Sequence, residues 1–226
     1  MLTHKRITAL SAFILLGLST ASLALADTVS ITPNLHKIEG KVHGKKIIIQ
    51  RNQDTKNTIN PAFAKTSRPC PPFCIQPAVL APGVETIGEV EVIDTLQKMI
   101  DGDTTHLLID SRTPDWVARG SIPGAKNIPW TKLSPSADPF TISDLLTKEF
   151  GARETEGLWD FSNAKTLVMF CNGMWCGQSP NNIKNLLRFG YPAHKIKWYR
   201  GGMQDWEIVG LSTTEPALQQ AQALDR

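Results

Sequence analysis

The stretch from Thr166 to Gln178, TLVMFCNGMWCGQ, constrains the fold of this chain more than any other. Its first five residues form a short apolar run between polar residues, which predicts a buried strand. Cys171 follows this strand directly, so its thiol is expected at the carboxyl end of a parallel strand, where α/β folds bind ligands. Ser179 as N-cap and Pro180 as first helical residue then predict a helix that runs to Gly190.

A thiol that faces the N-terminus of a helix lies near unpaired N–H groups and the positive end of the helix dipole. That environment lowers the pKa of the thiol and stabilises thiolates, persulfides and oxyanions. A lone cysteine after a core strand can instead be a buried structural residue. The combination of strand, glycine-containing loop and capped helix favours a reactive Cys171.

The first 26 residues are expected to be a secretory signal peptide. Lys5 and Arg6 precede an apolar run centred on residues 12–18, and Ala24-Leu25-Ala26 provides an A-x-A cleavage site before Asp27. The apolar run is too short for a membrane anchor. We therefore expect a periplasmic protein that has no membrane attachment after cleavage.

Charge and cysteine content narrow the possible partners. Loss of the signal peptide removes two positive charges and no negative ones, which lowers the formal net charge from +3 to +1. A nearly neutral chain gives no electrostatic reason to expect a nucleic-acid partner. The four cysteines form two close pairs, Cys70/Cys74 and Cys171/Cys176. Because exported compartments are oxidising, each pair is a candidate disulfide.

Residues 27–85 are predicted to be a small β-rich extension followed by a proline-rich connector. The segment KIEGKVHGKKIIIQ indicates a hairpin with a His-Gly turn. Residues 66–85 hold five prolines in twenty positions, which is typical of stiff extended chain. Cys70 and Cys74 lie in this connector and lack both further zinc ligands and the C-x-x-C-H pattern of covalent haem sites. A local disulfide is the favoured interpretation, and we expect no metal and no cofactor.

From residue 86 to residue 214, predicted strands alternate with predicted helices. The strands are expected at 106–110, 166–170 and 196–199, and the helices at 90–100, 114–119, 140–150, 179–190 and 203–209. This order predicts an α/β fold, a three-layer domain whose parallel sheet is covered by helices. The last residues, 215–226, are predicted to be a polar tail.

Two segments of this domain resemble the rhodanese-like sulfurtransferase family. The first is LLIDSRTPDWVARGSIPGAKNIPW, in which a strand ends in an acidic residue and an arginine before a G-x-I-P-G-A-x-N-I-P turn. The second, VMFCNGMWCGQSPNNIKNLLRFGYPAHKIKWYRGGMQDW, resembles the active-site half. Together they cover roughly residues 86–214. The residues that carry the first match are Asp110, Arg112, Gly120, Ile122, Pro123, Gly124, Ala125, Asn127, Ile128 and Pro129, and those of the second include Gly190, Tyr191, Gly201, Gly202 and Trp206.

The resemblance implies that Cys171 takes a sulfane sulfur from a small donor, forms a persulfide and passes the sulfur to a thiol acceptor. It also implies that the loop N–H groups cradle the persulfide and the donor's oxyanion. This substrate-binding loop comprises Asn172, Gly173, Met174, Trp175, Cys176, Gly177 and Gln178. Asp110 and Arg112 are expected to be structural, as an ion pair near the base of the loop.

Two positions depart from the family pattern. Ser121 stands where the family usually has histidine. The loop is longer than usual, and where related phosphatases carry an arginine that binds a dianion it has Cys176 and neither Arg nor Lys. The missing oxyanion clamp argues against phosphatase activity and weakens the case for thiosulfate as donor. Trp175 is expected either to line a less polar pocket or to cap the core.

Three functions remain open at this point. Sulfur transfer through Cys171 is the leading one, and thiol–disulfide chemistry through Cys171 and Cys176 is the second. The third is a non-catalytic module that binds an exported protein partner. We expect Cys176 to act as a resolving thiol that protects Cys171 from over-oxidation, with a small hydrophobe packed beside Trp175 as its alternative role.

Overall fold

The computed structural model of the protein describes residues 28–214. The predicted signal peptide with its cleavage site and the predicted tail at 215–226 lie outside these residues. Within them, no helix is both long enough and apolar enough to cross a bilayer.

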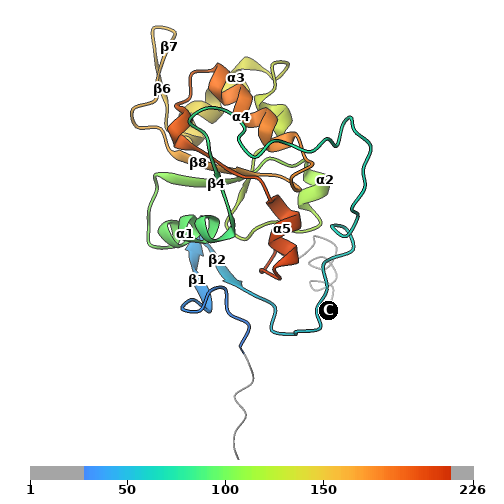
Figure 1. The fold of residues 1–226 in the computed structure, drawn as a ribbon. Helices are drawn as coiled ribbons and strands as arrows, with labels where there is room; N and C mark the ends of the chain where they lie inside the picture. The colour runs from blue at the N-terminus through green and yellow to red at the C-terminus, as the bar shows by residue number, and fades with distance from the viewer. Residues whose placement is uncertain (1–27, 215–226) are drawn as a thin grey trace, which may run out of the picture.

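A five-stranded parallel sheet forms the centre of the molecule (Figure 1). Its strands lie in the order β3 (Glu85–Ile87), β9 (Ile196–Tyr199), β8 (Thr166–Phe170), β4 (His106–Asp110) and β5 (Lys126–Asn127). The strand that precedes Cys171 is therefore central and paired on both sides. This position fixes the backbone of Cys171 through two neighbouring strands.

Helices cover both faces of the sheet (Figure 1). One face packs against α1 (Glu89–Ile100) and α5 (Gly202–Ile208). The other packs against α4 (Gln178–Arg188) and the segment in which α3 (Pro139–Asp144) continues as a π-helical turn, Leu145–Glu149. The remaining short elements are α2 (Pro114–Val117), the 3-10 turns Trp130–Leu133 and Ala193–Lys195, and a hairpin of β6 (Arg153–Thr155) and β7 (Leu158–Asp160). The predicted three-layer α/β fold is confirmed.

Successive side chains of β8 point to opposite faces of the sheet, so they belong to two separate hydrophobic clusters. Val168 and Phe170 belong to the cluster under α1 and α5, whereas Leu167 and Met169 belong to the cluster under α4. All four side chains are fully buried. A strand that buries both faces reads as a continuous apolar run, which is why this segment was recognisable in the sequence.

The predicted N-terminal hairpin is present as β1 (Lys37–Val42) and β2 (Lys45–Gln50), which pair in antiparallel register. Its apolar side chains do not form a separate core, because they join α1 in one cluster. Gly40 permits this close approach: a Cβ atom there would overlap the side chain of Ile100 at the end of α1. The extension is thus packed onto the sheet domain as an additional layer, below α1 in Figure 1.

Three predicted helix boundaries need correction. The helix expected at 140–150 begins at Pro139, capped by Asp138, and changes to π-helical geometry after Asp144. The helix expected at 114–119 ends at Val117. The helix after the cysteine loop begins at Gln178, so Ser179 is its second residue and not its N-cap. Proline at position 180 is compatible with this start, because N–H groups of the first turn have no partner within the helix.

The predicted connector, residues 66–85, forms no helix or strand except at Glu85, the first residue of β3. Residues 52–65, predicted as part of the β-rich extension, form no helix or strand either. Cys70 and Cys74 are joined by a disulfide, with Cα atoms 4.7 Å apart, which confirms the predicted pair. The connector follows the surface of the domain and passes over the cysteine loop. Gln76 fastens it there, since its N–H donates to the carbonyl of Met174 at 2.8 Å.

Candidate active site

Cys171 lies at the carboxyl end of β8, and its side chain is almost fully buried. Its carbonyl accepts a hydrogen bond from the N–H of Met203 in the first turn of α5, at 3.0 Å. Gly202 adopts a positive φ of 56°, and a Cβ atom there would overlap that same carbonyl. The glycine pair of the sequence match is therefore required for α5 to approach the backbone of the cysteine loop so closely.

The surroundings of the Cys171 thiol favour its ionised form. Burial opposes ionisation, but hydrogen bonds from the Cys176 thiol, from the Ser179 hydroxyl and from the backbone N–H groups of Ser179 and Gly173 outweigh it. Together they lower the pKa of Cys171 from 9.0 to about 7. Because this pKa lies below the ordinary value, the thiolate predominates above pH 7 and is lost as the pH falls through 7.

Cys176 has the opposite character, although it lies in the same loop. Burial, and then the hydrogen bond and charge of Cys171, raise the pKa of its thiol. Both cysteines are free thiols in the structure. The two thiols therefore differ: Cys171 ionises more readily, whereas Cys176 stays neutral. Cys171 Sγ lies 3.4 Å from the carbonyl oxygen of Cys176, and Cys176 Sγ donates to Gln178 Oε1 at 3.7 Å.

Ser179 contacts the nucleophile directly, a role that sequence reasoning missed by treating the residue as a helix cap. Its hydroxyl donates to Cys171 Sγ at 3.2 Å and accepts from Trp198 Nε1 at 3.2 Å. All three side chains are buried. The indole of Trp198 thus orients the hydroxyl so that its proton points to the sulfur.

The rest of the loop contributes backbone N–H groups near the two cysteines and side chains that surround them. The N–H groups of Gly173 and Ser179 help to lower the pKa of Cys171, and those of Asn172 and Gln178 oppose the rise in the pKa of Cys176. The Trp175 side chain is buried, that of Met174 is half-buried, and Gly177 is exposed. The structure thus places the predicted loop residues around two adjacent sulfur atoms, with Ser179 in addition.

Asp110 and Arg112 form a fully buried ion pair, with Arg112 Nη2 2.6 Å from Asp110 Oδ2. Ser121, the departure from the family pattern, donates its hydroxyl to the same carboxylate oxygen at 2.6 Å. Arg112 Nη1 reaches Asn172 Oδ1 at 3.4 Å, next to Cys171 in sequence. A buried ion pair with further hydrogen bonds holds its geometry, so this pair fixes the base of the loop.

Trp175 of the loop is held on several sides. Its Nε1 donates to Gln204 Oε1 at 2.7 Å. The guanidinium of Arg68 stacks over its ring at 3.8 Å, and Phe73 meets it edge-on at 5.6 Å. Arg68 and Phe73 both belong to the connector. The loop itself lacks a cation, and the connector places one against its tryptophan.

A pocket of about 320 Å³ opens beside Cys176. Four of its ten lining residues are aromatic. The lining combines three separate parts of the chain: the connector, the segment after β4, and the cysteine loop with the start of α4. The lining residues are Pro72, Phe73, Trp116, Trp130, Asn172, Trp175, Cys176, Gly177, Gln178 and Asn181. Trp175 lines this pocket and is also buried in a cluster with Cys171 and Cys176, so it takes both of the roles that the sequence left open.

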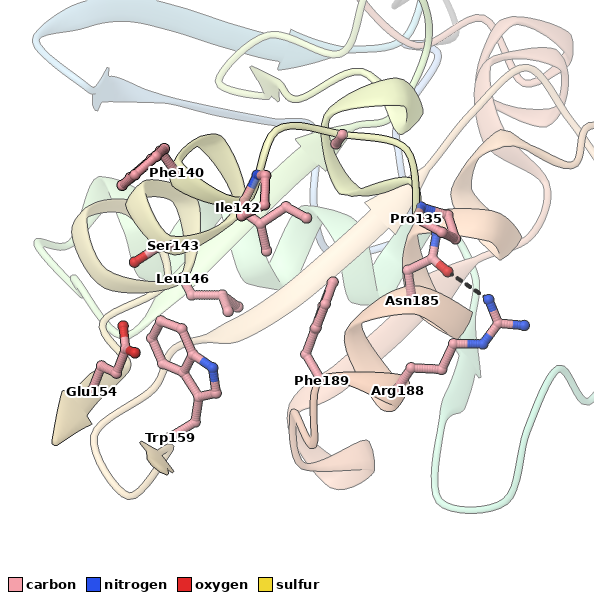
Figure 2. A pocket seen from close by; sticks show the side chains of 12 residues that line it. Pro135, Phe140, Ile142, Ser143, Leu146, Glu154, Trp159, Asn185, Arg188 and Phe189 are labelled. Atoms are coloured by element: carbon pink, nitrogen blue, oxygen red, sulfur yellow. Dashed lines mark hydrogen bonds between the residues drawn. The ribbon is translucent and has the colours of Figure 1, made fainter. Parts of the chain in front are cut away.

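A larger cavity of about 660 Å³ lies between α3, α4 and the β6–β7 hairpin. Figure 2 shows Phe140, Trp159, Phe189 and Arg188 around it. It shares no lining residue with the pocket beside Cys176, and no cysteine lines it. Among residues 28–214, no group of three or more His, Cys, Asp or Glu side chains is arranged to hold a metal ion.

Sequence reasoning also missed Arg68, Phe73, Trp116 and Trp130 as neighbours of the site. Two of them lie in the connector, which showed no part in the family resemblance, and only the disulfide motif around Phe73 drew attention to it. Trp116 and Trp130 were inside the first matching segment. Their aromatic character next to a conspicuous motif was the one available signal.

Comparison with known proteins gives a family and a fold. A family model described as "Rhodanese-like domain" matches residues 92–208. No curated protein matches the chain. Among solved structures, a protein from Bacillus halodurans is similar at 17% identity with a TM-score of 0.41, over 58% of this chain and 77% of the other.

Two further solved structures are similar, and their names refer to a rhodanese-like domain and to a sulfurtransferase. A rhodanese-like domain protein from Staphylococcus aureus is similar at 22% identity and a TM-score of 0.37, over 57% of this chain and 97% of that one. A thiosulfate sulfurtransferase from Pseudomonas aeruginosa is similar at 18% identity and a TM-score of 0.38, over 59% of this chain and 20% of that one. At such distances these names assign no substrate to this chain.

The family assignment thus rests on the match of the family model and on the site itself. The matched residues, 92–208, span more than half of the 226-residue chain and include α4, β8 and the whole cysteine loop. The buried ion pair after β4 and the cysteine after β8 lie within the same range. The chain belongs to the rhodanese-like domain family.

Proposed function

We propose that this protein is a sulfurtransferase that carries sulfane sulfur as a Cys171 persulfide. One observation carries the proposal: the Cys171 thiol, whose pKa is lowered to about 7, lies at the end of β8 among donors from Ser179 and Gly173. The thiolate is the nucleophilic form of cysteine, and these donors also suit the terminal sulfur anion of a persulfide. The family membership supports the same activity at a coarse level.

The reaction needs two displacement steps. The Cys171 thiolate attacks the outer sulfur of a small donor, the donor's sulfur–sulfur bond breaks, and the leaving group departs with the electron pair. An acceptor thiolate then attacks the outer sulfur of the persulfide, and Cys171 leaves as the thiolate. Neither step requires a metal, a cofactor or an external oxidant.

Intact-mass measurement tests the proposal. Wild-type protein incubated with a sulfane-sulfur donor is expected to gain one sulfur atom and to lose it when a thiol acceptor is added. The Cys171→Ser variant is expected to gain none, and Cys176→Ser serves as the matched control that keeps the nucleophile. Absence of the adduct from wild type with every donor tried would favour the binding-module alternative, in which the surface serves an exported protein partner.

Thiol–disulfide chemistry is a second candidate, because a specific contact favours it. Cys171 Sγ lies 3.4 Å from the carbonyl oxygen of Cys176, so the two cysteines are in contact. A Cys171–Cys176 disulfide would form when an oxidant takes two electrons from the pair, and a dithiol would reopen it. Exchange with a disulfide substrate in the absence of any sulfane sulfur would distinguish this activity from sulfur transfer.

We also propose that the protein acts in the periplasm after removal of its signal peptide. The n-region, apolar run and A-x-A site of residues 1–26 support this location. The disulfide in the connector is compatible with an oxidising compartment. N-terminal sequencing of periplasmic extract is expected to read Asp-Thr-Val-Ser, whereas an intact Met1 species in the membrane fraction would contradict the proposal.

A further inference from the structure

The larger cavity, between α3, α4 and the β6–β7 hairpin, takes no part in the chemistry proposed for Cys171. Eight of the twelve residues that line it are apolar. Figure 2 shows the side chains of Leu146, Trp159 and Phe189 around the space. Its volume of about 660 Å³ lies within the usual range of small-molecule pockets. The cavity therefore has the size and the lining of a site for a small organic molecule.

A buried amide of α4 lies at one end of this cavity. The side chain of Asn185 is only 2% exposed, and its Oδ1 accepts a hydrogen bond from Arg188 Nη1 at 3.0 Å (Figure 2). Its Nδ2 is buried as well and has no hydrogen-bond partner among residues 28–214. An unpaired buried N–H donor is costly. It therefore favours a ligand that brings an acceptor oxygen.

Arg188 adds a positive charge at the same end. Its side chain is half-buried, and within the described part of the chain it forms no ion pair. The hydrogen bond that it donates goes to the neutral amide of Asn185. A guanidinium presents several N–H groups in a planar fork that matches a carboxylate. Together the two side chains favour an anionic head with acceptor oxygens.

The other end of the cavity carries the opposite charge. Glu154 of β6 is exposed and lies beside Trp159, on the far side of the space from Arg188 in Figure 2. A second anionic group on the ligand would be repelled there, because like charges at short range raise the energy even near solvent. The lining thus favours a ligand with one carboxylate and an uncharged far end.

The backbone of the cavity wall gives an independent indication of function. Leu146 lies in the π-helical turn that follows α3, where the N–H of Phe150 donates to the carbonyl of Leu145 at 3.0 Å. The Leu146 side chain is fully buried and lines the cavity. Single π-helical turns are rare, and they occur frequently at functional sites.

We propose that this cavity binds a small organic monocarboxylate with an apolar, ring-containing body. The carboxylate accepts from Arg188 and from Asn185 Nδ2, and the body packs against Leu146, Phe189 and Trp159. The cavity and the pocket beside the cysteine loop have no lining residue in common. The binding is therefore independent of the function proposed for Cys171.

Calorimetric titration of the whole protein with 4-phenylbutyrate tests the inference. The alcohol 4-phenylbutan-1-ol lacks the charge and is expected to bind at least about tenfold more weakly. Butyrate lacks the ring and is also expected to bind at least about tenfold more weakly. A phenylbutyrate with a second carboxylate on the ring is expected to bind more weakly than phenylbutyrate itself, and Glu154→Gln is expected to narrow that difference.

Variants at the polar end provide the matched comparison. Arg188→Gln is expected to weaken phenylbutyrate about tenfold and to remove its preference over the alcohol. Asn185→Asp, which has the same shape, is expected to weaken it as well, because it replaces an N–H donor by a carboxylate. Arg153→Gln is the control, since this exposed arginine of β6 does not line the cavity. Thermal unfolding establishes that each variant is folded.

Three results would overturn the inference: no saturable binding of phenylbutyrate, equal affinity for the acid and the alcohol, or unchanged affinity in Arg188→Gln. Cys171→Ser is expected to bind phenylbutyrate as wild type does. If that binding holds while no donor forms a persulfide, the carboxylate site stands and the proposed function fails.

Discussion

The two cysteine pairs have nearly the same spacing and opposite chemistry. Cys70 and Cys74, four positions apart, form a disulfide in a connector without regular structure. Cys171 and Cys176, five positions apart, remain buried thiols between a central strand and a helix. Spacing alone therefore does not decide the fate of a close pair. The surroundings do, because they lower the pKa of the Cys171 thiol and raise that of the Cys176 thiol.

The two pairs are nevertheless parts of one site. The ring closed by the disulfide carries Pro72 and Phe73, and both line the pocket beside Cys176. Gln76, just after the ring, is bound on both sides: its N–H donates to Met174, and its carbonyl accepts from Arg200 Nη2 at 2.8 Å. The structural pair shapes the access to the reactive pair. The following predictions test this division of roles.

Loss of the nucleophile is expected to have the largest effect. Cys171→Ser should reduce sulfur transfer to cyanide or a dithiol by at least about a thousandfold, because a hydroxyl at this position cannot form a persulfide. Cys176→Ser should retain a measurable rate, since it keeps the nucleophile and the Ser179 hydroxyl that donates to it. Steady-state rates of the two variants provide the comparison. If Cys176→Ser were inactive and Cys171→Ser active, the assignment would be reversed.

Oxidation is expected to distinguish the role of Cys171 from that of Cys176. With peroxide, wild-type protein should form an intramolecular Cys171–Cys176 disulfide, because the adjacent thiol of Cys176 displaces water from the sulfenic acid of Cys171. Cys176→Ser should instead proceed to sulfinic and sulfonic acid at Cys171. The mass of the loop peptide after peroxide and then dithiothreitol distinguishes the products. Equal over-oxidation in both proteins would make Cys176 a packing residue.

Removal of one donor from the nucleophile is expected to have an intermediate effect. Ser179→Ala deletes the hydroxyl that donates to Cys171 Sγ. A hydrogen bond to a charged group is worth about 1.5–3 kcal/mol, so the pKa of Cys171 should rise by about one unit or more. Alkylation of Cys171 followed against pH gives the pKa directly, and the rate near pH 7 should fall about tenfold. An unchanged pH profile would show that Ser179 acts only in packing.

Opening the structural disulfide is expected to have the smallest effect. The Cys70→Ser/Cys74→Ser double variant should lose at most about 2 kcal/mol of stability, because the ring is short. Its KM for the sulfur donor should rise about threefold through loosening of Phe73, which lines the pocket, with little change in kcat. Steady-state kinetics and thermal unfolding measure the two effects. A large fall in kcat would mean that the connector takes part in the chemistry itself.

The three central strands of the sheet could be predicted from the sequence because they are buried runs with clear ends, whereas the short edge strands β3 and β5 were not predicted. The segments 106–110, 166–170 and 196–199 match β4, β8 and β9 residue for residue. These strands are apolar whatever the details of the tertiary packing, so the sequence alone reveals them. The π-helical turn after Asp144 had no comparable signal, since its residues are ordinary helix formers and only tertiary packing selects the wider turn.

The cysteine loop and the ion pair at its base could be predicted from the sequence, but the pocket beside them could not. Cys171 follows a strand, and its position results from the local order of strand, loop and helix. The pocket combines Phe73, Trp116, Trp130 and Trp175, which lie far apart in the sequence and meet through the crossovers of the fold. No local sequence pattern predicts that these four side chains come together. Ser179 was misassigned for a related reason: a serine at a helix start can cap the helix or serve a neighbour, and the helix began one residue before it.

Because the β1–β2 hairpin packs under α1, the segment that matches the family model is shorter than the segment that shares one hydrophobic core. The family match begins at residue 92, inside α1, and excludes both β3 and the hairpin. A chain cut at that boundary would lose an edge strand and uncover Val92, Ile93 and Leu96, which are fully buried in the whole protein. Transplanting the matched segment into another protein would therefore carry the catalytic loop without the apolar cover on which its scaffold depends.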